Sequence, residues 1–108
     1  MRGRPEARFC VDFQVFLSWQ QNGTIQRASG RCVDLSASGA KLETLDCLEP
    51  RGMVVVHSEV FGRMGNATIR YCQRDGMKYS VGLQFNMAFG LGDPVRRKMV
   101  NGVLRVES

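Results

Sequence analysis

Apolar and polar residues alternate with a period of two along several stretches of residues 9–85, and this alternation predicts β-strands with one buried face. Residues 9–19 form the longest stretch: every odd position is apolar, and Phe16 is an apolar exception among the even positions. Residues 79–85 show the clearest alternation. Residues 53–57 are apolar on both faces, which predicts a strand that is covered on both sides.

Turn signals separate these stretches. Asn22 and Gly23 predict a tight hairpin, and residues 74–76 predict a second reversal. We therefore expect six short strands, at 9–19, 24–33, 40–45, 53–57, 66–73 and 79–85. Short strands at such close spacing are typical of a small antiparallel β-barrel or sandwich.

The last segment changes from the strand period to the helical one. Asp93 and Pro94 are typical of a helix N-cap and first helical residue, and four apolar side chains then recur at helical spacing: Val95, Met99, Val103 and Val106. The sequence thus predicts a C-terminal α-helix over 91–108 that packs on a barrel spanning 9–90. Residues 1–8 remain as a flexible N-terminal arm.

Composition and charge narrow the class of protein. A chain of 108 residues with 44% hydrophobic and 23% charged residues predicts one folded domain. No apolar run approaches the roughly 18 residues of a spanning helix, and the N-terminus lacks the apolar middle of a signal peptide, so we expect a cytoplasmic protein without a membrane span. The net charge of +5 favours an anionic partner, whether nucleic acid, anionic lipid or a small phosphate compound.

The residues that usually carry catalysis or bind metal are sparse. The chain has four dispersed cysteines without a CxxC pair and one histidine, His57, which we expect in the core or at a strand edge. This set predicts neither a metal site nor a nucleophile–base pair, and no glycine-rich phosphate loop occurs, so we expect no enzyme. The thiols should be reduced, because two disulfides would require an oxidising compartment.

The candidate functional residues lie in two short segments. Arg4 and Arg8 precede the first strand, and the second strand runs into the turn sequence DLSASG at 34–39. Because the hairpin returns the chain to its start, Arg8 and Asp34 should lie at the same end. The arginines could also be a frayed basic tail, and Asp34 could simply cap a turn.

The segment RPEAR followed by DLSASG resembles the PilZ domain, whose signature is RxxxR and DxSxxG. The similarity covers roughly residues 4–85 and implies a split-barrel type of β-barrel that binds cyclic di-GMP. It implies five ligand contacts: Arg4, Arg8, Asp34, Ser36 and Gly39. Many family members have an arginine where this chain has Gly3, so the number of ligand molecules, one or a stacked pair, stays open.

The implied ligand suits these side chains. Arginine forks bind phosphate oxygens and the O6/N7 edge of guanine, whereas a carboxylate accepts hydrogen bonds from guanine N1–H and N2–H. Ser36 would supply a hydroxyl, and Gly39 would let the ligand approach the backbone. No cofactor is expected besides cyclic di-GMP as ligand.

The expected function is a stand-alone receptor and adaptor. Binding would order the arm over the barrel rim and change a surface offered to an unidentified downstream protein; the family regulates motility, biofilm formation and virulence. We expect no DNA or RNA partner. Two alternatives remain: a nucleic-acid-binding barrel that presents Arg70 and Tyr71, and a PilZ-like protein-interaction module that binds no nucleotide.

Overall fold

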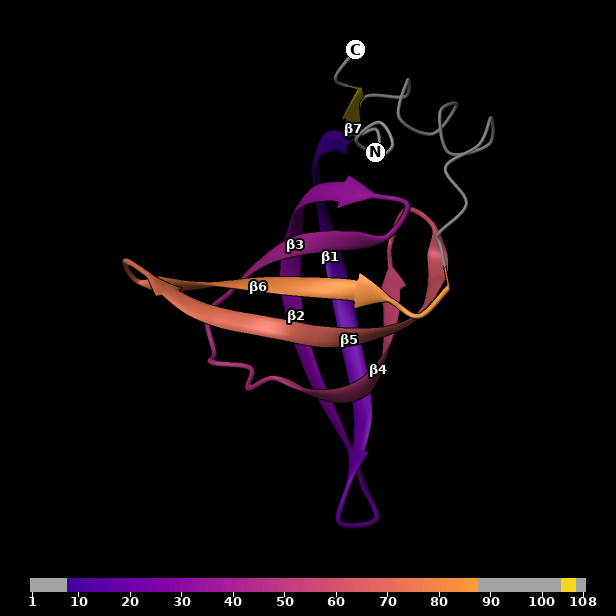
Figure 1. Ribbon diagram of the computed structural model, residues 1–108, viewed down its shortest axis with the longest axis vertical. Helices are drawn as coiled ribbons and strands as arrows, with labels where there is room; N and C mark the ends of the chain where they lie inside the picture. The colour runs from indigo at the N-terminus through magenta and orange to yellow at the C-terminus, as the bar shows by residue number, and fades with distance from the viewer. Residues whose placement is uncertain (1–7, 88–103, 107–108) are drawn as a thin grey trace, which may run out of the picture.

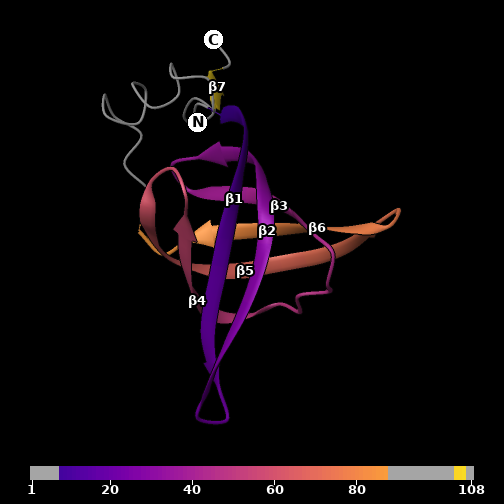
Figure 2. The same cartoon turned by 180° about the vertical axis from the view of Figure 1, so that it is seen from behind.

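The computed structural model of the protein describes residues 8–87 and 104–106, and every regular element in them is a β-strand. The strands are β1 (Arg8–Gln21), β2 (Thr24–Ser36), β3 (Gly39–Thr44), β4 (Arg51–Ser58), β5 (Gly62–Asp75), β6 (Lys78–Phe85) and β7 (Leu104–Val106). They pair in the order β2-β3-β6-β5-β4-β1-β7, and β1 pairs in addition with β2. The first six strands therefore close into a ring, and the predicted six-stranded antiparallel barrel is confirmed (Figures 1 and 2).

The alternation in β1 sends its apolar side chains into the barrel as predicted. Phe9, Val11, Phe13, Val15 and Leu17 are at most 7% exposed, whereas the even-numbered residues from Arg8 to Phe16 face solvent. The other strands add further side chains to the same core, among them Leu35, Leu42, Val54, Ile69 and Val81. Burial of this apolar surface is the main force that holds the ring together.

Strand β4 differs from its predicted environment. Val54 and Val56 are buried, but Met53 is 56% exposed and His57 is exposed as well. The prediction that this strand is covered on both sides is therefore wrong. In a closed single-layer barrel one face of each strand lines the core and the other faces outward, so a run of apolar residues leaves half of them on the surface.

The two hairpin turns form where the sequence predicts them. Asn22 and Gly23 have φ values of 54° and 78°, the positive pair that a two-residue type I′ turn between β1 and β2 requires. Gly76 has a φ of 66° between the paired ends of β5 and β6. The first turn brings the end of β2 back to the start of β1, which positions the candidate site.

The C-terminal prediction needs correction. Residues 104–106, expected in a helix, form β7 and pair antiparallel with residues 9–11 of β1. Strand β4 pairs with β1 only at 15–18, so this earlier stretch of β1 has backbone groups available on that side, and Leu-Arg-Val can satisfy them as a strand. The rest of the predicted helix and residues 1–7 lie outside the described residues.

Among the described residues there is no helix with the length and hydrophobicity that a membrane crossing needs.

Candidate functional site

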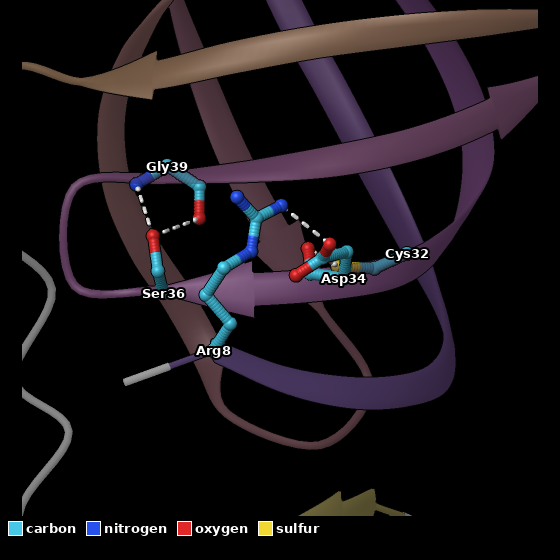
Figure 3. A network of polar contacts seen from close by, with 5 residues as sticks. All are labelled: Arg8, Cys32, Asp34, Ser36 and Gly39. Atoms are coloured by element: carbon cyan, nitrogen blue, oxygen red, sulfur yellow. Dashed lines mark hydrogen bonds and ion pairs between the residues drawn. The ribbon is translucent and has the colours of Figure 1, made fainter. Parts of the chain in front are cut away.

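Arg8 and Asp34 meet at one end of the β1–β2 hairpin, which confirms that they lie at the same end. Arg8 is opposite Ser36 in the strand register, and its Nη2 lies 2.5 Å from Oδ2 of Asp34 (Figure 3). The Arg8 side chain is 66% exposed and that of Asp34 28%. An ion pair this open to water adds little stability, so a ligand could replace it at small cost.

Ser36 and Gly39 close the turn from β2 to β3. The Ser36 hydroxyl accepts a hydrogen bond from the Gly39 N–H at 3.3 Å and approaches the Gly39 carbonyl oxygen at 3.4 Å (Figure 3). Both distances are long, so the contacts are weak. The two contacts give the Ser36 hydroxyl a role in the shape of the turn. Ser36 lines the same cavity as Arg8 and Asp34, and its predicted contact with a ligand stays a prediction.

Gly39 has a structural role that the sequence did not suggest. A Cβ atom at this position would lie 2.3 Å from the carbonyl oxygen of Leu83 on β6. Glycine is therefore required because two strands approach closely, and this requirement is independent of any ligand. Its predicted contact with the ligand is untested by this geometry.

A cavity of about 220 Å³ lies on the outer face of the barrel around these residues. Its lining comes from β1, β2, β3, β5, β6 and the turn between β2 and β3: Arg8, Asp34, Ser36, Ser38, Gly39, Ala40, Lys41, Arg70, Tyr71, Gly82 and Leu83. Four of the five predicted site residues thus lie together. The fifth, Arg4, is outside the described residues.

A β-bulge on β5 brings in two side chains that were not predicted as part of this site. Ile69 pairs with Leu83 and Tyr71 with Gly82, so Arg70 is an extra residue between them. Ile69 is buried, whereas Arg70 and Tyr71 are both exposed. A bulge re-aims side chains in this way and is frequent beside functional sites. In the sequence, Tyr71 continues the alternation of Ala67 and Ile69, so this pattern does not reveal the bulge.

The ring of Tyr71 lies directly over Gly82. A Cβ atom on Gly82 would be 2.1 Å from Cε2 of Tyr71 and 2.5 Å from its Cζ. The missing side chain therefore makes room for the aromatic ring at the edge of the cavity. An aromatic residue opposite a glycine on the neighbouring strand is the pattern that could have revealed this contact from the sequence.

The cavity has an excess of positive charge. Among the described residues, the lining holds three basic side chains, Arg8, Lys41 and Arg70, and one acidic side chain, Asp34, which leaves two positive charges in excess. Such a lining attracts a dianion, while the single carboxylate can accept hydrogen bonds from donor groups of the same ligand. The arrangement can therefore bind a phosphate compound that also carries N–H donors and a flat ring.

Cys32 lies behind Asp34 and is fully buried. Burial disfavours the thiolate and raises the pKa of Cys32 to about 12, and the negative charge of Asp34 acts in the same direction although the backbone hydrogen bond to Asp34 opposes it. The Cys32 thiol approaches the backbone oxygen of Asp34 at 3.5 Å. At neutral pH this cysteine is a neutral packing residue beneath the site (Figure 3).

Fold and site together define a small antiparallel β-barrel domain with a basic, aromatic-lined cavity on its surface. The PilZ domain family model matches residues 3–97 of the chain. The chain belongs to the PilZ domain family, as its two motifs predicted, and PilZ domains are in general receptors for cyclic di-GMP. A search of curated proteins found no match to this chain.

Proposed function

We propose that this protein is a stand-alone receptor for cyclic di-GMP that binds in the cavity around Arg8 and Asp34. The observation that carries the proposal is that Arg8 of the first family motif and Asp34, Ser36 and Gly39 of the second line one basic cavity together with Arg70 and Tyr71. The ligand has two phosphates and two guanines, and it therefore matches the cations, the carboxylate and the aromatic ring of the lining.

Three of the lining residues have a proposed part in binding. Asp34 accepts hydrogen bonds from guanine N1–H and N2–H, and the Arg8 fork contacts phosphate oxygens or the O6/N7 edge. Tyr71 stacks on a guanine, a contact worth about 1–3 kcal/mol for a base. In the absence of ligand Arg8 and Asp34 already lie together at the cavity, so binding needs little rearrangement of these two side chains.

Arg4 has a proposed role in the switch. In this scheme the ligand recruits Arg4, and residues 1–7 order over the barrel rim, next to Arg8, which already belongs to β1. Fixing a residue costs roughly 1–2 kcal/mol, so charge-assisted hydrogen bonds from the arginines must offset that cost. The ratio of ligand to protein, which Gly3 leaves open, would follow from the stoichiometry of binding.

The proposed output is a changed surface that an unidentified downstream protein recognises, without catalysis by this chain. The site of action is the bacterial cytoplasm, and the regulated process is among motility, biofilm formation and virulence. The nucleic-acid alternative was supported by the basic charge and by Arg70 and Tyr71; these two residues line the same cavity as Asp34, which favours the receptor instead.

The test is isothermal titration of the full chain with cyclic di-GMP. Arg8→Ala should weaken binding about tenfold to a hundredfold, because charge-assisted hydrogen bonds contribute roughly 1.5–3 kcal/mol. Arg8→Lys keeps the charge but loses the planar fork, and it should also weaken binding. Asp34→Ala should remove the preference for guanine over adenine in the cyclic dinucleotide.

Arg31→Ala is the matched control. Arg31 pairs with Asp12 on the surface of the same hairpin, and both lie outside the cavity, so this variant should bind like the wild type. Equal affinity of Arg8→Ala and the wild type would refute the proposed site. Absence of any binding would favour the protein-interaction module, whereas steep salt dependence with tight binding of unrelated RNA would favour the nucleic-acid-binding barrel.

A further inference from the structure

Two cysteines that are far apart in the sequence lie in contact on the barrel. Cys47, in the connection between β3 and β4, has its Sγ 3.8 Å from Sγ of Cys72 on β5. Both thiols are reduced; Cys47 is exposed and Cys72 is half-buried. Of the other two cysteines, Cys32 is fully buried beneath Asp34 and Cys10 is exposed on β1.

We propose that Cys47 and Cys72 form a reversible intramolecular disulfide when the protein meets a peroxide. The Cys47 thiolate attacks one oxygen of hydrogen peroxide, which gives a sulfenic acid and, with one proton, water. The Cys72 thiolate then attacks the Cys47 sulfur and displaces hydroxide, which takes up one proton and leaves as the second water. In total, two thiols lose two protons and two electrons, and one peroxide is reduced to two molecules of water.

The local structure allows the two sulfur atoms to approach bonding distance. An S–S bond is about 2.05 Å long, so the present 3.8 Å must shorten by less than about 2 Å. Cys47 belongs to the connection 45–50, which is not in a strand, and its side chain faces solvent. The next residue keeps Cys47 close to Cys72, because Leu48 is 5% exposed and its N–H donates to Sγ of Cys72 at 3.2 Å.

The two cysteines also differ in a way that suits the order of the reaction. A peroxide in solution can reach the exposed Cys47, while Cys72 lies partly inside the barrel and is suited to attack second.

The contact with Cys72, some burial and the nearby charge of Glu49 raise the pKa of Cys47. Formation of the bond should therefore be faster at mildly alkaline pH than at neutral pH.

The bond would join parts of the barrel that are not adjacent strands. Strands β3 and β5 lie on opposite sides of β6, so a link from the end of β3 to β5 spans β6. It would also close a loop of the chain from 47 to 72, which restricts the unfolded state. The oxidised protein should unfold at a higher urea concentration than the reduced one. This inference does not depend on cyclic di-GMP binding.

The experiment compares the reduced full chain before and after treatment with hydrogen peroxide. Free thiols are alkylated in denaturant without reductant, and the intact mass and the peptide map are measured. In the wild type we expect two fewer alkyl groups, the loss of two hydrogen atoms and a crosslinked peptide pair that contains Cys47 and Cys72. Dithiothreitol should restore all four alkylated thiols and the lower urea midpoint.

Three variants make the outcome specific. Cys47→Ser and Cys72→Ser should each abolish the crosslink, whereas Cys10→Ser, which removes the other exposed thiol, should retain it. The inference is wrong if four thiols remain alkylatable in the oxidised wild type, if Cys47 gains oxygen without a crosslink, or if the crosslink joins two chains or involves another cysteine.

Discussion

Gly39 offers the sharpest test of how the barrel is built, because a side chain at this position would collide with the backbone of β6. In Gly39→Ala the new Cβ would lie 2.3 Å from the Leu83 carbonyl oxygen, where ordinary contact begins at 3.4 Å. The obstacle is backbone, since Ala40 pairs with Leu83 and Gly39 with Gln84 between β3 and β6. The two strands must separate by about 1 Å to accommodate the methyl group.

The magnitude follows from three contributions. Overpacking a well-fitted contact costs about 1–3 kcal/mol, and a weakened hydrogen bond between β3 and β6 costs about 0.5–1.5 kcal/mol. Replacing glycine restricts the unfolded chain and returns about 0.4–1 kcal/mol. The free energy of unfolding should therefore fall by about 0.5–4 kcal/mol, a large part of the roughly 5–15 kcal/mol typical of a domain.

Urea denaturation followed by far-ultraviolet circular dichroism measures this change. With a slope of about 1–3 kcal/mol per molar urea, the midpoint of Gly39→Ala should drop by on the order of 1 M. Gly52→Ala is the matched control, because a Cβ atom there would have no neighbouring atom within 4 Å and the φ of Gly52 is not positive. It should be neutral or slightly stabilising. A Gly39→Ala midpoint equal to that of the wild type would refute the close-approach argument.

The remaining predictions concern the aromatic edge of the cavity, the buried thiol and the core. In Gly82→Ala the Cβ meets the Tyr71 ring, which can move aside, so stability should stay near that of the wild type while cyclic di-GMP affinity falls about tenfold; unchanged affinity in a titration would contradict this. Burial raises the pKa of Cys32 from 9.0 to about 12, so its contribution to stability is fully present below pH 9 and is lost as pH rises toward 12, by up to about 1.4 kcal/mol per pH unit. Urea midpoints of Cys32→Ala should decline less steeply over that range, and parallel declines would contradict the assignment. Leu42→Ala, at a fully buried core position, should cost about 2–5 kcal/mol in the same denaturation experiment, and a loss under 1 kcal/mol would show that the site collapses around the gap.

Local patterns in the sequence predicted much of the barrel. The period of two in β1 identified which side chains enter the core, because a strand in a closed barrel has one inner and one outer face. The Asn22-Gly23 turn fixed the hairpin, and the return of the chain then predicted that Arg8 and Asp34 meet. Each of these inferences uses residues that are close in sequence or joined by one turn.

The structural features that the sequence did not reveal depend on pairing between distant segments. The bulge at Arg70 is defined by the register of β5 against β6, so the alternation alone could not show that Arg70 and Tyr71 face the same cavity as Asp34. The pairing of 104–106 with β1 is likewise a long-range contact. The requirement for glycine at position 39 comes from Leu83, more than forty positions later in the chain.

The β1–β2 hairpin has a practical consequence for work on this protein. Its turn at Asn22 and Gly23 is exposed and lies at the end of the hairpin opposite Arg8 and Asp34, as the projecting loop in Figure 1 illustrates. Exposed turn tips tolerate inserted segments well. A fluorescent reporter or an immobilisation tag placed between these two residues should leave the cavity accessible, which makes the turn a natural attachment point for a ligand biosensor.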